Sequence, residues 1–213
     1  MELVCTTTRE TKRGNSGMSF NVINEFEEAL AHYTGAKWAI MTDNCTNALE
    51  LCFRYDKVQR CNFSAYTYLS IYQLLHKLNV SYTLKEEVWQ GEYHFHNTRI
   101  WDCARKLEQG MYKENQLQCL SFGYDKPLYL GWGGAILTDD KEFYEKNIRL
   151  RYDGRTLNDK KWSDRPVQRI GYHMRPTPEL AQEGLNKIAN FRSPGLGRKA
   201  NELYPNGRDL KWE

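Results

Sequence analysis

The apolar residues between positions 22 and 33 are spaced as on one face of a helix. They are Val22, Ile23, Phe26, Ala29, Leu30 and Tyr33. Gly35 follows at a position where glycine commonly ends a helix, and the apolar run Trp38–Met41 then predicts a buried strand. The polar residues Asp43–Thr46 predict a turn, and the apolar positions between Ala48 and Phe53 predict a second helix after it.

The alternation of strand and helix patterns continues to about residue 152. Further strands are predicted near residues 58–61, 80–84, 99–102, 117–122 and 134–137, and further helices over residues 67–78 and 139–152. Strands that alternate with helices indicate a layered α/β domain with a largely parallel sheet. Residues 1–18 are predicted to be irregular, as is the segment from Arg192 onward, which is rich in Gly, Pro, Asn, Lys and Arg.

Composition and charge narrow the class of protein. The net charge of +3 over 213 residues is too small and too dispersed to indicate nucleic-acid binding. The first 15 residues are polar, unlike a signal peptide, and no apolar run approaches the roughly 20 residues of a membrane span. The six cysteines have no metal-ligand spacing, which favours reduced, mostly buried thiols in a cytoplasmic protein. They are Cys5, Cys45, Cys52, Cys61, Cys103 and Cys119.

Lys126 is the candidate nucleophile. It ends the segment Ser121–Lys126, an apolar run closed by a turn, and Gly131–Gly134 follows closely. A lysine that forms an imine needs surroundings that lower its pKa and admit a flat partner. Asp102 ends another apolar run, and a carboxylate beside a protonated ring nitrogen is the usual complement in pyridoxal phosphate (PLP) chemistry. Taken alone, a lysine near glycines is more often part of a surface loop.

Three other segments have both a functional and a structural interpretation. The turn before the second helix offers N–H groups that can bind an anion, but Asn44 or Thr46 can equally be a helix N-cap only. A tyrosine of Tyr66–Tyr68 can stack on a flat ring or pack in the core. His94 and His96 alternate as two metal ligands on a strand would, but no matching Cys, Asp or Glu cluster accompanies them, so no metal site is predicted.

Several segments, in their order along the chain, resemble motifs of the DegT/DnrJ/EryC1/StrS family of PLP-dependent sugar aminotransferases. The resemblance runs from about residue 16 to residue 185, and the ordered set is more specific than any one member. The first segments are Phe26–Gly35, similar to FEexxAxyxG, Asn44–Leu49, similar to SGTxAL, and Tyr66–Ser70, similar to the segment with the cofactor-stacking aromatic residue. The later ones are Trp101–Arg105 (EDxAQ or EDxAH), Ser121–Lys126 with Gly133–Gly134 (SFxxxK and GG), Arg151–Gly154 (RxHG) and Gly171–Arg175 (GyNyR).

The resemblance implies a role for each matching residue. Lys126 would hold PLP as an imine and move the proton during the reaction, and Asp102 would pair with the pyridine nitrogen. The other cofactor contacts that it implies are a phosphate site at Asn44, Cys45, Thr46 and Ser121, the stacking ring of Tyr68, Arg105 near the phenolic oxygen, and His173 at the phosphate of a neighbouring subunit.

The chain departs from the family pattern at four positions. Cys45 replaces the usual glycine and adds a side chain to the phosphate turn. Arg105 replaces Gln or His, and a cation there would favour a deprotonated phenolic oxygen. His173 replaces an Asn, and Asp153 replaces the His of RxHG.

The fold that the resemblance implies is the large domain of fold-type-I PLP-dependent transferases, a three-layer α/β/α sandwich with a mostly parallel sheet. We expect this PLP-binding domain to span residues 1–191. Residues 192–213 are expected to form a loosely structured C-terminal tail, with the smaller domain of the relatives largely absent.

The implied function is a PLP-dependent aminotransferase. It would move an amino group, with glutamate as the expected donor, to a keto sugar, and family analogy suggests a nucleotide-linked keto-deoxyhexose. Lysine at position 126, where the family's dehydratase branch has histidine, argues against that branch. The expected partner chain is a second copy in a homodimer with shared active sites, and neither nucleic acid nor membrane is expected to bind. The alternative is a degenerate PLP-fold subunit that binds cofactor or a partner chain with little turnover.

Overall fold

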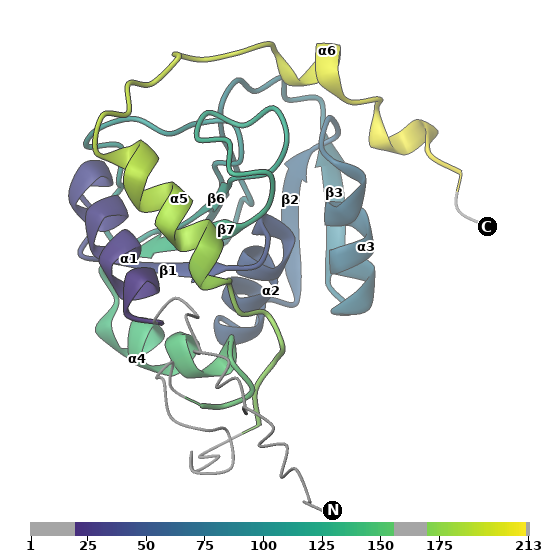
Figure 1. The fold of residues 1–213 in the computed structure, drawn as a ribbon. Coiled ribbons are helices and arrows are strands. Elements are labelled where there is room, and N and C mark those ends of the chain that lie inside the picture. Colours follow the sequence, from purple (N-terminus) through teal and green to yellow (C-terminus); the bar gives the residue numbers. More distant parts are fainter. Residues whose placement is uncertain (1–19, 156–169, 212–213) are drawn as a thin grey trace, which may run out of the picture.

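The computed structural model of the chain describes residues 20–155 and 170–211 (Figure 1). The predicted irregular segment 1–18 lies outside these ranges. In chain order the elements are α1 (Asn21–Thr34), β1 (Trp38–Thr42), α2 (Cys45–Tyr55), β2 (Arg60–Ser64), α3 (Leu69–Lys77), β3 (Ser81–Lys85), β4 (Tyr93–His94), β5 (Ile100–Asp102), β6 (Leu117–Ser121), β7 (Gly134–Thr138), α4 (Lys141–Leu150), α5 (Pro178–Ile188), α6 (Ala200–Leu203) and the 3₁₀ helix η2 (Gly207–Asp209).

The strands form a five-stranded sheet in the order β1-β7-β6-β5-β4 and a separate pair, β2-β3. The α/β class with a central sheet is as predicted, but the expectation of mostly parallel strands needs correction. The pairs β5-β6 and β2-β3 are parallel, whereas β1-β7, β6-β7 and β4-β5 are antiparallel. The chain passes from β6 to β7 through a loop without a crossover helix, and such a connection reverses the strand direction.

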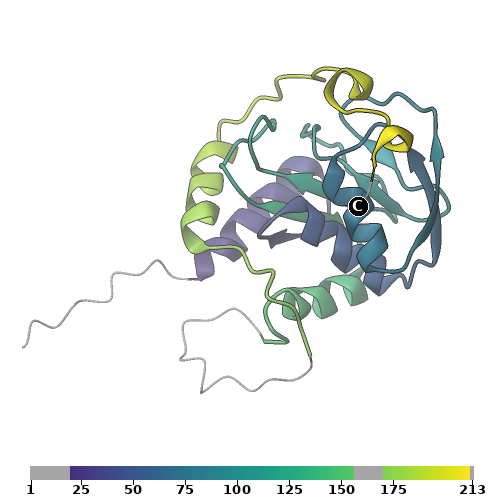
Figure 2. The same cartoon turned by 90° about the vertical axis from the view of Figure 1, so that its right-hand side faces the viewer.

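Helices cover both faces of the sheet and make three layers (Figure 2). Along β1 the side chains alternate, so that Ala39 and Met41 join a core cluster with α1 and α5, whereas Ile40 joins a cluster with α2, α3 and α4. In β7, Ala135 and Leu137 lie in the first cluster and Ile136 in the second. Because both faces of these strands are covered, their sequences are continuous apolar runs.

The predicted helices and strands up to residue 152 are confirmed, with ends that differ by at most three residues. Gly35 ends α1 with a left-handed φ of 78°, the conformation for which glycine was expected there. The two-residue strand β4 and helix α5 were not predicted. For α5 the sequence does hold a signal, because the Thr177 side chain accepts from the backbone N–H of Leu180 and Pro178 occupies the first turn.

The C-terminal segment is hydrogen-bonded to the rest of the protein at Ala200 and Gly207. Ala200 N donates to Trp89 O at 2.9 Å, and Gly207 N donates to Ala65 O at 2.7 Å. The segment passes over the top of the molecule in Figure 1 and carries α6 and η2. These contacts differ from the loose tail that was expected, although the division into a domain over residues 1–191 and a tail stays a prediction.

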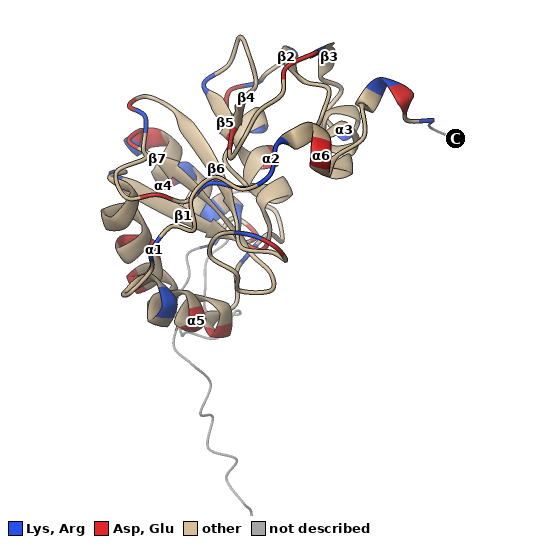
Figure 3. Ribbon diagram, turned by 90° about the horizontal axis from the view of Figure 1, so that it is seen from above, with Lys and Arg blue, Asp and Glu red and all other residues tan. Residues whose placement is uncertain are grey.

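Surface and thiol chemistry agree with an ordinary globular chain. Lys and Arg residues lie among Asp and Glu residues along the elements (Figure 3). Among the described residues, no helix is both long enough and apolar enough to cross a bilayer. The five described cysteines are free thiols, of which Cys45 is half-buried and the other four are buried: Cys52, Cys61, Cys103 and Cys119.

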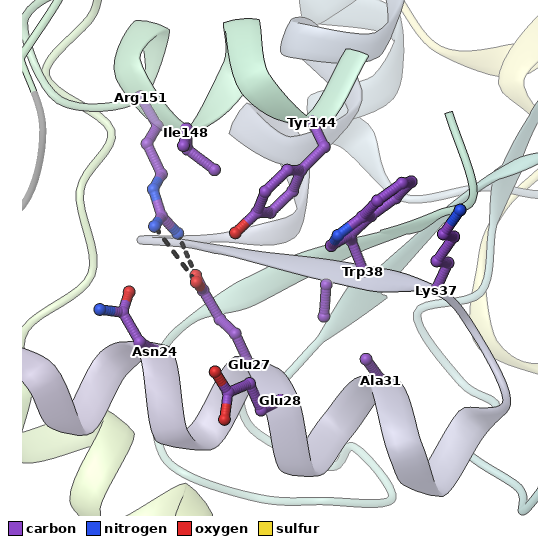
Figure 4. A pocket seen from close by; sticks show the side chains of 10 residues that line it. Asn24, Glu27, Glu28, Ala31, Lys37, Trp38, Tyr144, Ile148 and Arg151 are labelled. Atoms are coloured by element: carbon purple, nitrogen blue, oxygen red, sulfur yellow. Dashed lines mark hydrogen bonds and ion pairs between the residues drawn. The ribbon is translucent and has the colours of Figure 1, made fainter. Parts of the chain in front are cut away.

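A buried ion pair joins α1 to the end of α4 (Figure 4). Arg151 is 1% exposed and Glu27 is 5% exposed. The guanidinium of Arg151 donates to the Glu27 carboxylate and to the carbonyl oxygen of Met41, while the backbone N–H of Met41 donates to Glu27 Oε1 at 2.6 Å. The ion pair therefore satisfies both backbone groups of Met41 at the edge strand β1.

The backbone of Arg151 extends this connection toward the start of α2. Met174 N donates to Arg151 O at 2.9 Å, and Asp43 N donates to Met174 O at 3.1 Å. Asp43 follows β1 and begins the turn before α2. The position of that turn thus depends on a chain of contacts that begins at one buried arginine.

The substitution Glu27→Ala should lower the free energy of unfolding by about 3–5 kcal/mol, because it leaves the Arg151 charge buried without its partner. Urea unfolding followed by circular dichroism measures this. Glu145→Ala is the matched control, since it removes the exposed Lys141–Glu145 pair and should cost less than about 1 kcal/mol. Equal losses in the two variants would contradict the importance of the buried pair.

Candidate functional site

The candidate site is a cavity of about 720 Å³ at one edge of the central sheet. β5 and β6 are parallel, so both end at this edge, and β7, which runs the other way, begins there. The carboxyl ends of strands are the usual location of binding sites in α/β folds. Of the nine residues predicted from the sequence for the cofactor site, eight line this cavity: Asn44, Cys45, Thr46, Tyr68, Asp102, Arg105, Ser121 and Lys126.

Asp102 is a buried carboxylate at the end of β5, with 5% of its surface exposed. Its Oδ2 accepts from the Tyr93 hydroxyl at 3.0 Å, and its Oδ1 accepts from the backbone N–H of Ala104 at 2.9 Å. Burial raises the pKa of Asp102, whereas the Ala104 N–H, the Lys126 charge and the Tyr93 hydroxyl act to lower it. A cation brought into the cavity would therefore stabilise the ionised form of Asp102.

Lys126 lies on the loop between β6 and β7. Its pKa is lowered by burial and by the charge of Arg105, while Asp102, Cys45 and Asp125 act in the opposite direction. A lowered pKa leaves more of the amine neutral near pH 7, which is the form that attacks a carbonyl. Surroundings that lower the pKa are what a lysine that forms an imine needs, and the role of Lys126 as the nucleophile stays a prediction.

The N-terminus of α2 meets the start of β7 at the cavity. Asn44 is the N-cap of α2, and its side chain accepts from Asn47 N at 2.8 Å, so the structural role proposed for it as a cap is confirmed. A Cβ on Gly134 would lie 2.5 Å from Asn44 C and Cys45 N, so only glycine allows β7 to approach this closely. The first N–H groups of a helix lack partners within the helix, and here they border the cavity.

Hydroxyl and thiol groups complete this side of the cavity. Thr46 Oγ1 lies 2.7 Å from Ser70 Oγ, and Ser121 ends β6. Burial raises the pKa of the Cys45 thiol well above its usual range, so this thiol is a neutral, polarisable group near pH 7. The arrangement has the donors that a phosphate needs: a helix N-terminus and neutral hydroxyl groups.

Aromatic rings form the outer wall of the cavity. Tyr68 is 62% exposed, and its ring contacts Tyr204 edge to face at a centroid distance of 6.3 Å. Tyr204 in turn stacks on Trp89 at 6.0 Å, and Trp132 stands 59% exposed on the loop beside Lys126. The stacking of Tyr68 on a cofactor ring stays a prediction.

His173 is the one predicted site residue that does not line the cavity. Its side chain is 75% exposed, and its Nδ1 lies 3.2 Å from the Asp153 carboxylate. The carboxylate of Asp153 has a pKa that its neighbours Arg155 and His173 lower against the opposing effect of burial. The role of His173 toward a neighbouring subunit stays a prediction.

Three residues that complete the site were not indicated by the sequence: Tyr93, Trp89 and Tyr204. The Tyr93 hydroxyl donates a hydrogen bond to Asp102 and lies 2.7 Å from Thr67 Oγ1. Trp89 and Tyr204 form part of the aromatic wall of the cavity. Tyr93 pairs with Asp102 in the register of β4 and β5, which a two-residue strand does not reveal in the sequence. Tyr204 is an aromatic residue in a polar segment, which is a signal that could have been used.

The two histidines considered as metal ligands have other partners. His94 stacks on Trp101 at a centroid distance of 4.5 Å and its Nε2 contacts Thr98 O at 2.8 Å. His96 Nε2 contacts Glu87 Oε2 at 2.9 Å. Within residues 20–155 and 170–211, no group of three or more His, Cys, Asp or Glu side chains is suited to hold a metal ion.

The donor set of the cavity fits PLP. The cofactor has an aldehyde, a ring nitrogen that is positive when protonated, and a phosphate. The cavity has an amine of lowered pKa on Lys126, a buried carboxylate on Asp102 and a helix N-terminus at Cys45. Its volume lies in the range of small-molecule sites.

Solved structures share the fold of the chain at low sequence identity. A protein assigned as a sugar aminotransferase from Streptococcus pneumoniae, in PLP form, aligns with a TM-score of 0.66 and 16% identity over 83% of this chain and 61% of that one. PseC of Helicobacter pylori, an aminotransferase of pseudoaminic acid biosynthesis, has a TM-score of 0.61 and 16% identity over 82% and 59% of the two chains. A DegT DnrJ EryC1 StrS aminotransferase from Brucella abortus has a TM-score of 0.63 and 16% identity over 79% and 58%.

These similarities establish the fold, and the chain spans about three fifths of the length of these solved proteins. A search of curated protein sequences gave no significant match. The sequence profile of the DegT/DnrJ/EryC1/StrS aminotransferase family matches residues 3–81 and 108–202, which is most of the sequence. The chain therefore belongs to the DegT/DnrJ/EryC1/StrS aminotransferase family, whose members depend on PLP.

Proposed function

We propose that the protein is a PLP-dependent aminotransferase whose active site is the cavity between β5, β6 and the start of α2. The observation that carries the proposal is that the amine of Lys126 and the carboxylate of Asp102 line one cavity with a helix N-terminus. A positive ring nitrogen would find its counter-charge in Asp102, and a phosphate would find donors at Cys45 and Thr46. The family membership supports the same assignment.

The chain's own groups have distinct tasks in this proposal. PLP, when bound, supplies an electrophilic carbon and a ring that takes up the electrons released from the donor's Cα. Lys126 Nζ would hold the cofactor and, once released by the donor amine, would carry the proton from the donor's Cα. Asp102 would keep the ring nitrogen protonated, with Tyr93 and the Ala104 N–H fixing its orientation.

The substrate proposal is a keto sugar, and by family analogy a nucleotide-linked keto-deoxyhexose, with glutamate as the amino donor. The aromatic wall of the cavity, formed by Tyr68, Trp132 and Tyr204, supports a sugar as the substrate, because the apolar C–H face of a pyranose packs well on aromatic rings. Lysine at position 126 supports amino transfer over the dehydratase chemistry of the histidine-bearing branch.

The alternative is a degenerate subunit that binds PLP or a partner chain with little turnover. The bonds that Tyr93 and Ala104 make to Asp102, together with the lowered pKa of Lys126, favour the enzyme. A subunit that only binds has no need to bury a carboxylate beside an amine, since such burial costs stability. Addition of glutamate to the PLP-loaded protein separates the two functions, because only an enzyme releases the keto acid of glutamate, whereas imine exchange with glutamate can change the cofactor's absorbance without turnover.

We also propose a homodimer with shared active sites. His173 is exposed, lies outside the cavity of its own chain, and belongs to a segment that matches a family motif. In a two-fold dimer such a residue can serve the cavity of the other chain. The Nδ1–Asp153 contact would orient the ring and leave Nε2 for the partner's phosphate.

Lys126→Ala should abolish covalent attachment of PLP and lower transamination by at least about a thousandfold, since the nucleophile and the proton carrier are one amine. Incubation with PLP, reduction with borohydride and peptide mass spectrometry measure the attachment. Lys141→Ala, which changes an exposed lysine on α4 outside the cavity, is the control and should retain attachment at Lys126. Unchanged attachment in Lys126→Ala would refute the assignment.

Asp102→Asn should retain part of the PLP binding but lose transamination by about a hundredfold or more, because each 1.4 kcal/mol of lost coupling to the ring nitrogen is a factor of ten. Single-turnover reaction with glutamate, followed by absorbance, measures the loss. Asp209→Asn, at an exposed position of η2, is the matched control. A near-normal rate in Asp102→Asn would show that another group faces the ring nitrogen.

Mixing a Lys126→Ala chain with a His173→Ala/Arg175→Ala chain should restore activity that neither chain has alone. In a shared arrangement one of the two sites in each mixed dimer has no lesion, so random pairing at equal amounts gives about a quarter of wild-type activity. Native mass spectrometry would verify that mixed dimers form. Mixed dimers without recovered activity would rule out the shared site.

A further inference from the structure

The Arg105 guanidinium donates hydrogen bonds to both the main chain and the side chain of Asp125, the residue that precedes Lys126. Its Nη1 donates to the carbonyl oxygen of Asp125 at 3.0 Å, and its Nη2 donates to Asp125 Oδ2 at 2.7 Å. The Arg105 side chain is 16% exposed, whereas that of Asp125 is 67% exposed. A planar guanidinium that holds both the main chain and the side chain of one residue restricts that residue far more than a single hydrogen bond does.

The residue held in this way has an unusual backbone. Asp125 has a φ of 59°, in the left-handed region that most residues with a Cβ avoid. Two neighbouring backbone contacts join the start of this loop to its end: the Gly123–Gly131 bridge, and the Leu130 N–H, which donates to Phe122 O at 2.9 Å. Asp125 lies inside this closed loop, immediately before Lys126, and Arg105 contacts it from the segment after β5.

Arg105 is itself firmly placed. Its backbone N–H donates to Gly91 O at 3.1 Å, and its side chain lines the cavity beside Tyr204. In the described part of the chain its buried Nε atom has no hydrogen-bond partner. One donor of the guanidinium is therefore not used by the Asp125 contact.

Three charged groups surround the Lys126 amine. Arg105 adds a positive charge, and Asp102 and Asp125 add negative charges. After burial, the Arg105 charge is the main cause of the lowered pKa of Lys126, and the two carboxylates oppose it. The two members of the Arg105–Asp125 pair thus act on the amine in opposite directions.

We propose that Arg105 is a positioning residue for Lys126, which fixes the Lys126 backbone through Asp125 and keeps a second positive charge beside its amine. The importance of this role rests on the proposed function, in which Lys126 must attack as a neutral amine. The motif position of Arg105 has Gln or His in the resembled pattern, so the pair with Asp125 is a feature of this chain's own residues.

The test measures the Lys126 amine directly in the full chain, without PLP. Trace acetylation with acetic anhydride at a series of pH values, followed by mass spectrometry of the Lys126 peptide, gives the pH midpoint at which the amine becomes reactive. The variants are Arg105→Gln, Arg105→Lys and Asp125→Asn. Arg54→Gln, which breaks the half-buried Arg54–Glu50 pair outside the cavity, is the matched control.

Removal of the positive charge in Arg105→Gln should raise the pKa of Lys126, shift the midpoint to higher pH and slow acetylation below the midpoint by about threefold or more. Asp125→Asn should shift the midpoint to lower pH, because it removes a negative charge that raises the pKa. Arg105→Lys keeps the positive charge but cannot donate to the main chain and the side chain of Asp125 at the same time. The midpoint of acetylation should therefore stay near that of the wild type, while the amount of PLP trapped on Lys126 by borohydride falls.

An unchanged midpoint in Arg105→Gln, or shifts of Arg105→Gln and Asp125→Asn in the same direction, would overturn the proposal. Asp125 is exposed enough for its variant to fold even where an Arg105 variant does not, so the test has a result in either case. Failure of PLP to attach to the wild type would count against the proposed function only, since acetylation needs no cofactor.

Discussion

The buried guanidinium of Arg151 is the constraint on which much of the structure depends. A charge that is 1% exposed must have partners, and its partners are the Glu27 carboxylate on α1 and the carbonyl of Met41 on β1. The backbone carbonyl of Arg151 accepts a hydrogen bond from Met174 N, and the carbonyl of Met174 accepts one from Asp43 N. The edge strand, two helices and the turn before α2 therefore share one set of polar contacts, and the cavity is built on that turn.

In the cavity, burial of charged residue types changes their pKa values. Asp102 and Lys126 are charged residue types placed where burial disfavours their charges, so the pKa of the acid is raised and that of the amine is lowered. Tyr93 and the Ala104 N–H fix the acid, and Arg105 with Asp125 fixes the loop of the amine. The buried contacts of Arg151 fix the relative positions of α1, β1 and α4, whereas burial at Asp102 and Lys126 prepares groups that a bound ligand can use.

The sequence predicted those parts of the site that follow directly from local patterns. Asp102 was found because it ends an apolar run, and Ser121 because its segment resembles a family motif; the parallel strands β5 and β6 bring both residues to one edge of the sheet. Tyr93 and Tyr204 were missed because their roles depend on pairings between segments distant along the chain. The direction of β7 was missed for a related reason, since an apolar run has the same pattern in parallel and antiparallel neighbours.

The central claim is that one cavity holds PLP between Lys126, Asp102 and the N-terminus of α2. A crystal structure of the full chain grown with PLP tests it most directly. The account predicts continuous density from Lys126 Nζ to the cofactor, with the ring nitrogen facing the Asp102 carboxylate and the phosphate at the backbone N–H groups of Cys45 and Thr46. PLP bound at another place, or in this cavity with its phosphate turned toward Asp102, would contradict the account.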